Sequence, residues 1–143
     1  MKIAVINGPN LNMLGKREAG HYGTGTLAEL MEELKSTHST HEFLFFQSNH
    51  EGELVDFIQK RAVDTDIDAL IANFGGLTHS SVSIRDALAL LHIPKIEVHL
   101  SNIHAREEFR HTSITAGACN GVIAGFGFQS YHLAVKAIEG MQK

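Results

Sequence analysis

The chain has 143 residues, a formal net charge of −4 at pH 7 and a single cysteine, Cys119. This length predicts one domain covering residues 1–143, and it is too short for a (β/α)₈ barrel, which needs about 200 residues or more. The acidic balance and the lack of any basic run argue against a nucleic-acid partner.

Targeting and metal-binding signals are also missing from the sequence. The N-terminus runs straight into a strand pattern, and no apolar run reaches the roughly 18 residues that cross a membrane. A single cysteine can form no internal disulfide, so we expect a cytoplasmic protein with no membrane association. The 10 histidines include no convincing helical His-x-x-x-His pair and have no cysteine partner, so we expect neither a metal nor a cofactor.

Apolar runs of strand length alternate with segments whose apolar residues recur at helical spacing. The runs are nearly all apolar, which indicates a parallel sheet covered by helices on both faces. With right-handed crossovers, the pattern predicts an α/β fold, a flavodoxin-like three-layer sandwich with a five-stranded parallel sheet of order 2-1-3-4-5. The strands are expected at residues 2–6, 42–47, 69–73, 96–100 and 121–126.

Capping signals place the helix starts between these strands. Thr26 and Glu29 form one capping box, and Ser48 with Glu51 forms a second. The remaining helices are expected after Ser80 or Ser81 as far as Leu91, after Ser101 or Asn102, and over residues 130–141.

The fourth strand combines an apolar face with a chemical one. Side chains alternate across a strand, so Glu97, His99 and Ser101 share the face opposite the apolar residues. Glu97 can orient the imidazole from two positions away. In the helix expected next, Arg106 and Arg110 lie four apart, where like charges repel unless something anionic or polar faces them. The backbone amides at that helix start would form a further anion site.

A glycine-punctuated loop at about residues 15–25 has the length and composition of a lid. It carries Arg17 and Tyr22. A tyrosine pKa near 10 falls by about 1–3 units beside a cation, and a fall of about two leaves roughly a tenth of the phenol ionised at pH 7. Tyr22 can therefore act as a general base; a solvated tyrosine on a surface loop is the plainer interpretation.

Parallel sheets of this order bind ligands beyond the carboxyl ends of the strands, where the strand order reverses. The polar residues expected there suit removal of a proton beside a carbonyl by Tyr22, an enolate held by a donor such as Asn10, and protonation of a leaving hydroxyl by His99. Each has a simpler alternative: Asn10 as a turn residue, His79 as a helix cap, Asp86 as a solvated helix charge. The set expected at this edge is Asn10, Arg17, Tyr22, Asn73, His79, His99, Leu100 and Ser101.

Other chemistries on this topology lack their motifs. There is no Gly-x-x-x-x-Gly-Lys-Ser/Thr phosphate loop, no Gly-x-Ser-x-Gly elbow, no acidic cluster after the first strand and no lysine at the expected edge. Two non-enzymatic hypotheses stay open, a binding module for small anions that does not turn over and, more weakly, a flavin-binding electron carrier.

Several linked motifs resemble type II 3-dehydroquinate dehydratase over nearly the whole chain. They are Asn7-Gly8-Pro9-Asn10-Leu11-Asn12 with Arg17, Tyr22-Gly23, Gly75-Gly76-Leu77-Thr78-His79 with Arg85-Asp86, and Ile96-Glu97-Val98-His99-Leu100-Ser101-Asn102-Ile103 with Arg106-Glu107 and Phe109-Arg110.

The resemblance implies dehydration of 3-dehydroquinate to 3-dehydroshikimate by a metal-free anti elimination through an enolate. In that family pattern Tyr22 is the base, Arg17 lowers its pKa, and His99, oriented by Glu97, is the acid for the departing hydroxyl. The pattern also implies a homo-oligomer, typically a dodecamer built as a tetramer of trimers, in which Asp86 is lent to a neighbouring active site. The remaining substrate contacts that it implies are Asn73, Leu100 and Ser101 for the carboxylate and His79 and Arg110 for ring hydroxyls.

Overall fold

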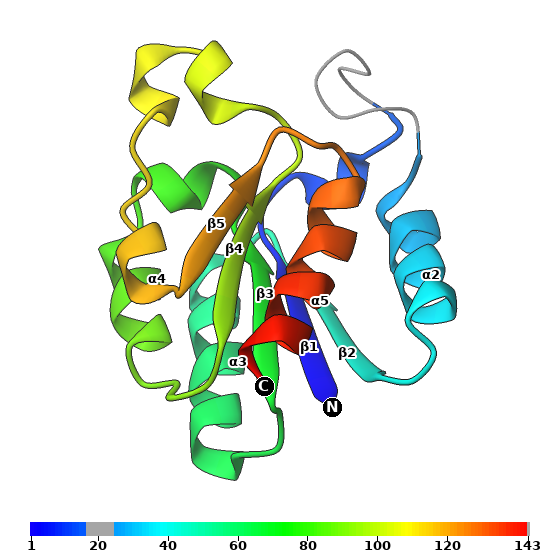
Figure 1. Cartoon of the computed structure of the whole chain (residues 1–143). Coiled ribbons are helices and arrows are strands. Elements are labelled where there is room, and N and C mark those ends of the chain that lie inside the picture. Colours follow the sequence, from blue (N-terminus) through cyan, green and yellow to red (C-terminus); the bar gives the residue numbers. More distant parts are fainter. Residues whose placement is uncertain (17–24, 143) are drawn as a thin grey trace.

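A computed structural model describes residues 1–16 and 25–142 of the chain. Its sheet has five strands, all parallel, in the order β2-β1-β3-β4-β5 (Figure 1). The predicted α/β fold and strand order are thereby confirmed. The strand bounds are β1 (Lys2–Asn7), β2 (Glu42–Gln47), β3 (Ala69–Asn73), β4 (Lys95–His99) and β5 (Gly121–Ala124).

Two apolar cores, one on each face of the sheet, make the three layers. Helices α2 (Leu27–Thr37) and α5 (Gln129–Met141) supply buried residues to the core on one face. Helices α3 (Glu51–Asp64) and α4 (Val82–Leu88) do the same on the other face. Strands buried on both faces are the reason for the continuous apolar runs in the sequence. In the part of the chain that the structure describes, no helix is long and apolar enough to cross a membrane.

One of the two predicted capping boxes forms. The Thr26 hydroxyl accepts a hydrogen bond from the Glu29 amide, and the Glu29 carboxylate accepts one from the Thr26 amide. The second box is wrong: α3 begins after His50, whose side chain makes no cap. Ser48 instead accepts the His50 N–H and donates to the carboxylate of Glu53, not Glu51.

The helix expected after the fourth strand does not form. Residues 101–118 contain three short 3₁₀ turns, Ile103–Ala105, Glu108–Arg110 and Ala116–Ala118. Asn102 caps the first turn, but Arg106 is extended and ends it. Phe109, which lies at helical spacing from Asn102 and Ala105 in the sequence, is 65% exposed. With this apolar side chain exposed, a helix here would lack the packing that stabilises most helices in proteins.

Two other boundaries are shorter than predicted. Strand β5 ends at Ala124 rather than at 126, because Gly125 turns the backbone to a φ of 98°. Helix α4 starts after Ser81, whose hydroxyl accepts the Ile84 N–H, and ends at Leu88 rather than Leu91.

A pair of buried histidines joins the end of α2 to α5. The Nε2 atom of His38 lies 3.0 Å from Nδ1 of His132, and the other nitrogen of His132 lies 3.2 Å from a Glu33 carboxylate oxygen. One ring must donate and the other accept, so both cannot carry a full complement of protons in this contact. Burial lowers the pKa of His38, and the charges of His132 and Lys136 lower it further.

Acid should therefore weaken the fold at this pair. Because the pKa of His38 is lowered in the folded protein, the unfolded chain binds more protons in the range just below about pH 6.5. We expect the free energy of unfolding to fall between about pH 7 and pH 5 by up to 1.4 kcal/mol per pH unit. Urea unfolding of the parent, His38→Gln and the exposed control His92→Gln at both pH values measures this. An equal pH dependence in parent and His38→Gln would show that the pair has no such effect.

Candidate active site

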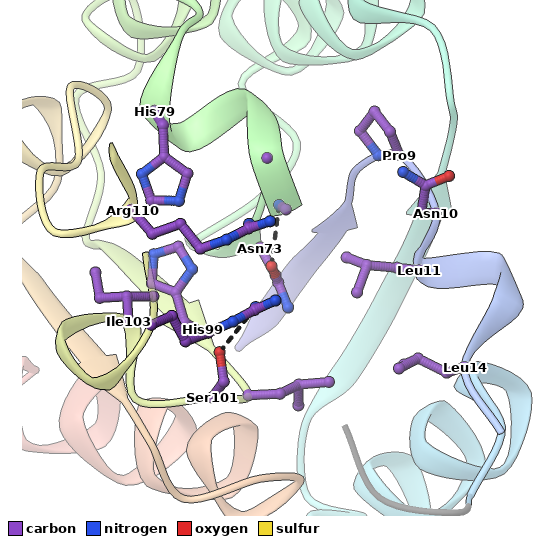
Figure 2. Close-up of a pocket in the computed structure, with 14 residues that line it drawn as sticks. Pro9, Asn10, Leu11, Leu14, Asn73, His79, His99, Ser101, Ile103 and Arg110 are labelled. Atoms are coloured by element: carbon purple, nitrogen blue, oxygen red, sulfur yellow. Dashed lines mark hydrogen bonds between the residues drawn. The ribbon is translucent and has the colours of Figure 1, made fainter. Parts of the chain in front are cut away.

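A cavity of about 150 Å³ opens at the carboxyl ends of β1, β3 and β4, where the strand order reverses (Figure 2). This cavity lies where the sequence analysis placed the binding site, beyond the carboxyl ends of the strands at the reversal of strand order. None of the described lining residues is acidic, whereas two arginines and two histidines are among them. Such a lining favours a small anion with hydroxyl groups. The lining comprises Pro9, Asn10, Leu11, Leu14, Asn73, Gly75, Gly76, His79, His99, Leu100, Ser101, Ile103, Arg106 and Arg110.

The sheet presents His99 to this cavity and ties it to Glu97. The strand alternation places both side chains on the same face, and Nε2 of His99 lies 2.8 Å from Oε2 of Glu97. His99 is 5% exposed and Glu97 is fully buried. With Nε2 engaged by the carboxylate, Nδ1 is the nitrogen left to exchange a proton with a ligand.

Glu97 stays ionised in spite of its burial. Burial alone would raise the pKa of Glu97, but hydrogen bonds from His99, Thr115 and Ser113 and the nearby imidazole charge outweigh it, and the pKa lies below its ordinary value. A carboxylate held in this way stabilises an imidazolium and fixes its ring plane. The buried pair can therefore deliver a proton to a leaving group.

Asn73 is held at the end of β3 by two buried partners. Its side-chain oxygen accepts the Gly75 N–H at 3.1 Å, and its Nδ2 donates to the Tyr131 hydroxyl at 2.9 Å. Tyr131 donates in turn to Oδ1 of Asn7 at 2.6 Å. These two bonds fix the orientation of the Asn73 amide. Its second Nδ2 hydrogen has no hydrogen-bond partner among the described residues and can be donated to a ligand. Tyr131 and Asn7 were not predicted for the site.

His79 and Arg110 line the same wall as His99 (Figure 2). Nδ1 of His79 donates to the Thr112 carbonyl at 2.9 Å, and the rings of His79 and His99 stack with centroids 6.4 Å apart. Arg110 donates from Nε to Glu107 at 2.8 Å. That bond lowers the pKa of Glu107, so the carboxylate remains charged and orients the guanidinium.

Arg106 is a pocket residue that was not among the predicted site residues. Its Nη1 lies 3.4 Å from the Ser101 hydroxyl. The four-residue spacing from Arg110 was noticed in the sequence, but as a helix-face pattern. The two guanidinium groups share the cavity although no helix connects them.

Asn10 lies on the opposite wall of the cavity from His79 and His99 (Figure 2). It has a left-handed φ of 70°, and its backbone N–H donates to the Asn49 side chain at 2.9 Å. Turn residue and pocket residue are thus both correct descriptions. Leu100 and Ser101 follow β4 into the lining, as expected.

Four predicted site residues are not in the described lining of this cavity. Glu97 is fully buried and reaches the cavity only through His99. Asp86 is exposed on α4 and does not line it. Arg17 and Tyr22, with most of the lid expected at about residues 15–25, lie outside the described residues. Among the described residues, no group of three or more His, Cys, Asp or Glu side chains could hold a metal ion.

Comparisons with known proteins agree with this architecture. The family model described as dehydroquinase class II matches residues 1–139. A 3-dehydroquinate dehydratase of Lachnoclostridium phytofermentans is 53% identical over 143 residues, covering 99% of this chain and 98% of the relative. The crystal structure of a type II dehydroquinase from Butyrivibrio crossotus superposes with a TM-score of 0.93 at 46% identity, covering 97% of each chain. The crystal structure of a type II dehydroquinase from Propionibacterium acnes superposes with a TM-score of 0.91 at 38% identity, covering 96% of this chain and 94% of that chain.

Proposed function

The chain belongs to the class II dehydroquinase family, and from that premise we propose that it dehydrates 3-dehydroquinate to 3-dehydroshikimate by an anti elimination through an enolate. The reaction would serve aromatic amino acid biosynthesis by the shikimate pathway or the use of quinate. The observation that carries the proposal is the buried Glu97–His99 pair, 2.8 Å between Oε2 and Nε2, facing a small cavity whose described lining has no acid.

The proposed elimination has two proton transfers. Tyr22, with its pKa lowered by Arg17, removes a proton from the carbon beside the ketone, and the electrons move onto the carbonyl oxygen. A donor such as Asn10 stabilises that enolate. The enolate then collapses, the carbon–oxygen bond at C1 breaks, and His99 protonates the departing hydroxyl to water. No oxidant or cofactor is needed, because the step only removes water.

The substrate contacts follow from the polarity of the cavity. The Asn73 amide and the chain at Leu100 and Ser101 would hold the substrate carboxylate, since they offer hydrogen-bond donors. His79 and Arg110 would hold ring hydroxyls. Arg106 adds a second guanidinium in the same cavity, and we include it among the groups that hold the anion.

The position of Asp86 bears on the assembly of the protein. Asp86 is exposed on α4, outside the cavity, which is consistent with a carboxylate that serves a neighbouring subunit. We propose a homo-dodecamer, a tetramer of trimers, with Asp86 crossing a subunit interface. Cys119, the sole cysteine, fits a cytoplasmic location, since the chain has no thiol to pair it with.

An ultraviolet assay for the conjugated enone tests the reaction. We expect the pure protein to convert 3-dehydroquinate at the same rate with and without a chelator, because no step uses a metal. Calorimetry that detects binding without any growth of absorbance would instead support the small-anion binding module. Loss of turnover on chelation would contradict the metal-free mechanism.

A further inference from the structure

We propose that residues 112–115 form a clamp that positions both pocket histidines, and that the Ser113 and Thr115 hydroxyls are positioning groups for His99, acting through Glu97. The inference rests on the proposed role of His99 as the acid. It concerns residues outside the cavity lining, which touch the reacting groups only through other side chains.

The first half of the clamp surrounds the Glu97 carboxylate. The Ser113 hydroxyl donates to Oε2 at 2.7 Å, the same oxygen that faces His99. The Thr115 hydroxyl donates to Oε1, and the Thr78 hydroxyl lies 3.1 Å from that oxygen. Thr78 and Thr115 are fully buried, so these hydroxyls replace water as the solvation shell of the anion.

Proton counting fixes the direction of the Ser113 bond. The ionised Glu97 carboxylate can only accept, so the single Ser113 hydroxyl proton is directed to it, while the Ser113 oxygen accepts the Ala116 N–H at 3.0 Å and lies 3.2 Å from the Thr115 hydroxyl. Thr78 and Thr115 lie 2.8 Å apart, oxygen to oxygen, and between them have two protons for Oε1 and for each other. The carboxylate is thus faced by donors, which stabilises its charged form.

The second half of the clamp holds the other histidine. The Thr112 carbonyl accepts the Nδ1–H of His79 at 2.9 Å. The neighbouring Ser113 and Thr115 hold the Glu97 carboxylate, which in turn holds His99. One short segment therefore orients the rings of both His79 and His99, which stack with centroids 6.4 Å apart and 20° between their planes. A shift of this segment would therefore move the two rings relative to each other.

Two hydrogen bonds at Ile114 hold the clamp against the rest of the molecule. Its N–H donates to the Thr78 carbonyl at 2.9 Å, and its carbonyl accepts from Nη1 of Arg85 at 2.6 Å. Arg85 is on α4, next to Asp86 in the sequence. The irregular segment 112–115 is thus anchored by hydrogen bonds to the Thr78 backbone and to the Arg85 side chain.

The titratable groups facing Glu97 are few. His99 forms a hydrogen bond with Glu97, and Cys119 interacts electrostatically with the Glu97 carboxylate. Burial and the negative charge of Glu97 raise the pKa of Cys119 to about 12. The thiol therefore stays neutral across the working pH range, and changes in the ionisation of Glu97 depend on His99 and the hydroxyls.

Thr115→Val tests the clamp, because it removes the hydroxyl and keeps the shape. We expect kcat to fall about tenfold with KM within about twofold, since the acid is misplaced while the substrate contacts remain. Without this donor the pKa of Glu97 rises, so the further loss of kcat at low pH that protonation of Glu97 causes, beyond the loss from protonation of Tyr22, should begin about one pH unit higher. Thr115→Ser, which keeps the hydroxyl, should restore both values, and Ser36→Ala on α2 is the control for loss of an exposed hydroxyl.

The design separates this inference from the proposed function. Parent enzyme and His99→Ala are assayed in the same series, and a parent without turnover would count against the dehydratase itself. An active parent with unchanged kcat and pH profile in Thr115→Val would overturn the clamp alone. If Thr115→Val does not fold, Ser113→Ala decides in the same way, because that half-buried hydroxyl donates to the same carboxylate and an unaltered profile there would also overturn the clamp.

Discussion

Replacing His99 with alanine is expected to lower kcat for dehydration by about 10²–10⁴-fold, the usual contribution of a positioned general acid. His99 supplies the proton for the hydroxyl that leaves, and hydroxide is a poor leaving group without it. The side chain lies on the last residue of β4, whose backbone remains paired with β5, so the fold should persist. The ultraviolet assay gives the rate, and circular dichroism checks the fold.

Isotope exchange can show which half of the elimination is lost. In His99→Ala the base can still form the enolate, which takes a proton back from solvent, so 3-dehydroquinate should exchange hydrogen for deuterium without forming product. In Tyr22→Phe both exchange and product should be absent. Nuclear magnetic resonance of the substrate in deuterium oxide distinguishes the two variants.

The control for this prediction is another histidine from the same stretch of chain. His104 is exposed and does not line the cavity, and its ring is tilted by 46° against that of His111, with centroids 5.9 Å apart. His104→Ala should keep the parent rate. Full activity in His99→Ala would refute the assignment of the acid, and loss of exchange in that variant would argue for a concerted rather than a stepwise elimination.

The sheet was predictable because its signal is local. Each strand is an apolar run buried on both faces, and the loops between carry glycine, proline or a capping residue. The Glu97–His99 pair followed from the same logic, since a period of two places those side chains on one face. The sequence of β4 therefore predicts both the strand and the contact between Glu97 and His99.

Residues 101–118 were predicted less well, because their side chains serve the site rather than a core. Asn102 and Ser113 use their side chains to hold backbone groups of this segment, and Phe109 is exposed. The helix expected after Ser101 or Asn102 rested on a capping signal and residue spacing, neither of which reports such side-chain bonds. The Ser48 box failed similarly, since Glu53 reaches the serine that the sequence motif assigns to Glu51.

The contribution of Tyr131 was beyond any local pattern. Its hydroxyl bonds to Asn7, which is 124 positions away in the chain, and α5 reads only as an amphipathic helix. Nothing in the spacing of apolar residues indicates that a phenol at this position joins the ends of β1 and β3. Asn7 and Asn73 are register partners in the sheet, so the contact exists only once the sheet has formed.

Tyr131→Phe is expected to lower the free energy of unfolding by about 2–4 kcal/mol. The change leaves a buried amide oxygen on Asn7 and a buried N–H on Asn73 without their partner, and each such group costs about 1–3 kcal/mol. Tyr131 is fully buried, and burial raises its pKa, so the group removed is a neutral hydroxyl at any working pH. Urea unfolding of parent and variant measures the loss.

A double-mutant cycle with Asn7→Ala separates this network from general packing. Both single changes break the same bond between the Tyr131 hydroxyl and Oδ1 of Asn7, so the double variant should lose less stability than the sum of the two. The single variant Tyr131→Phe should also raise KM about fivefold. Without the Tyr131 hydroxyl the Asn73 amide can rotate, and the loss of about 1 kcal/mol of binding free energy corresponds to that factor. Strict additivity together with a parental KM would mean that the hydroxyl neither supports the ends of the strands nor orients Asn73. An elevated KM with additive stabilities would retain only its effect on the substrate contact.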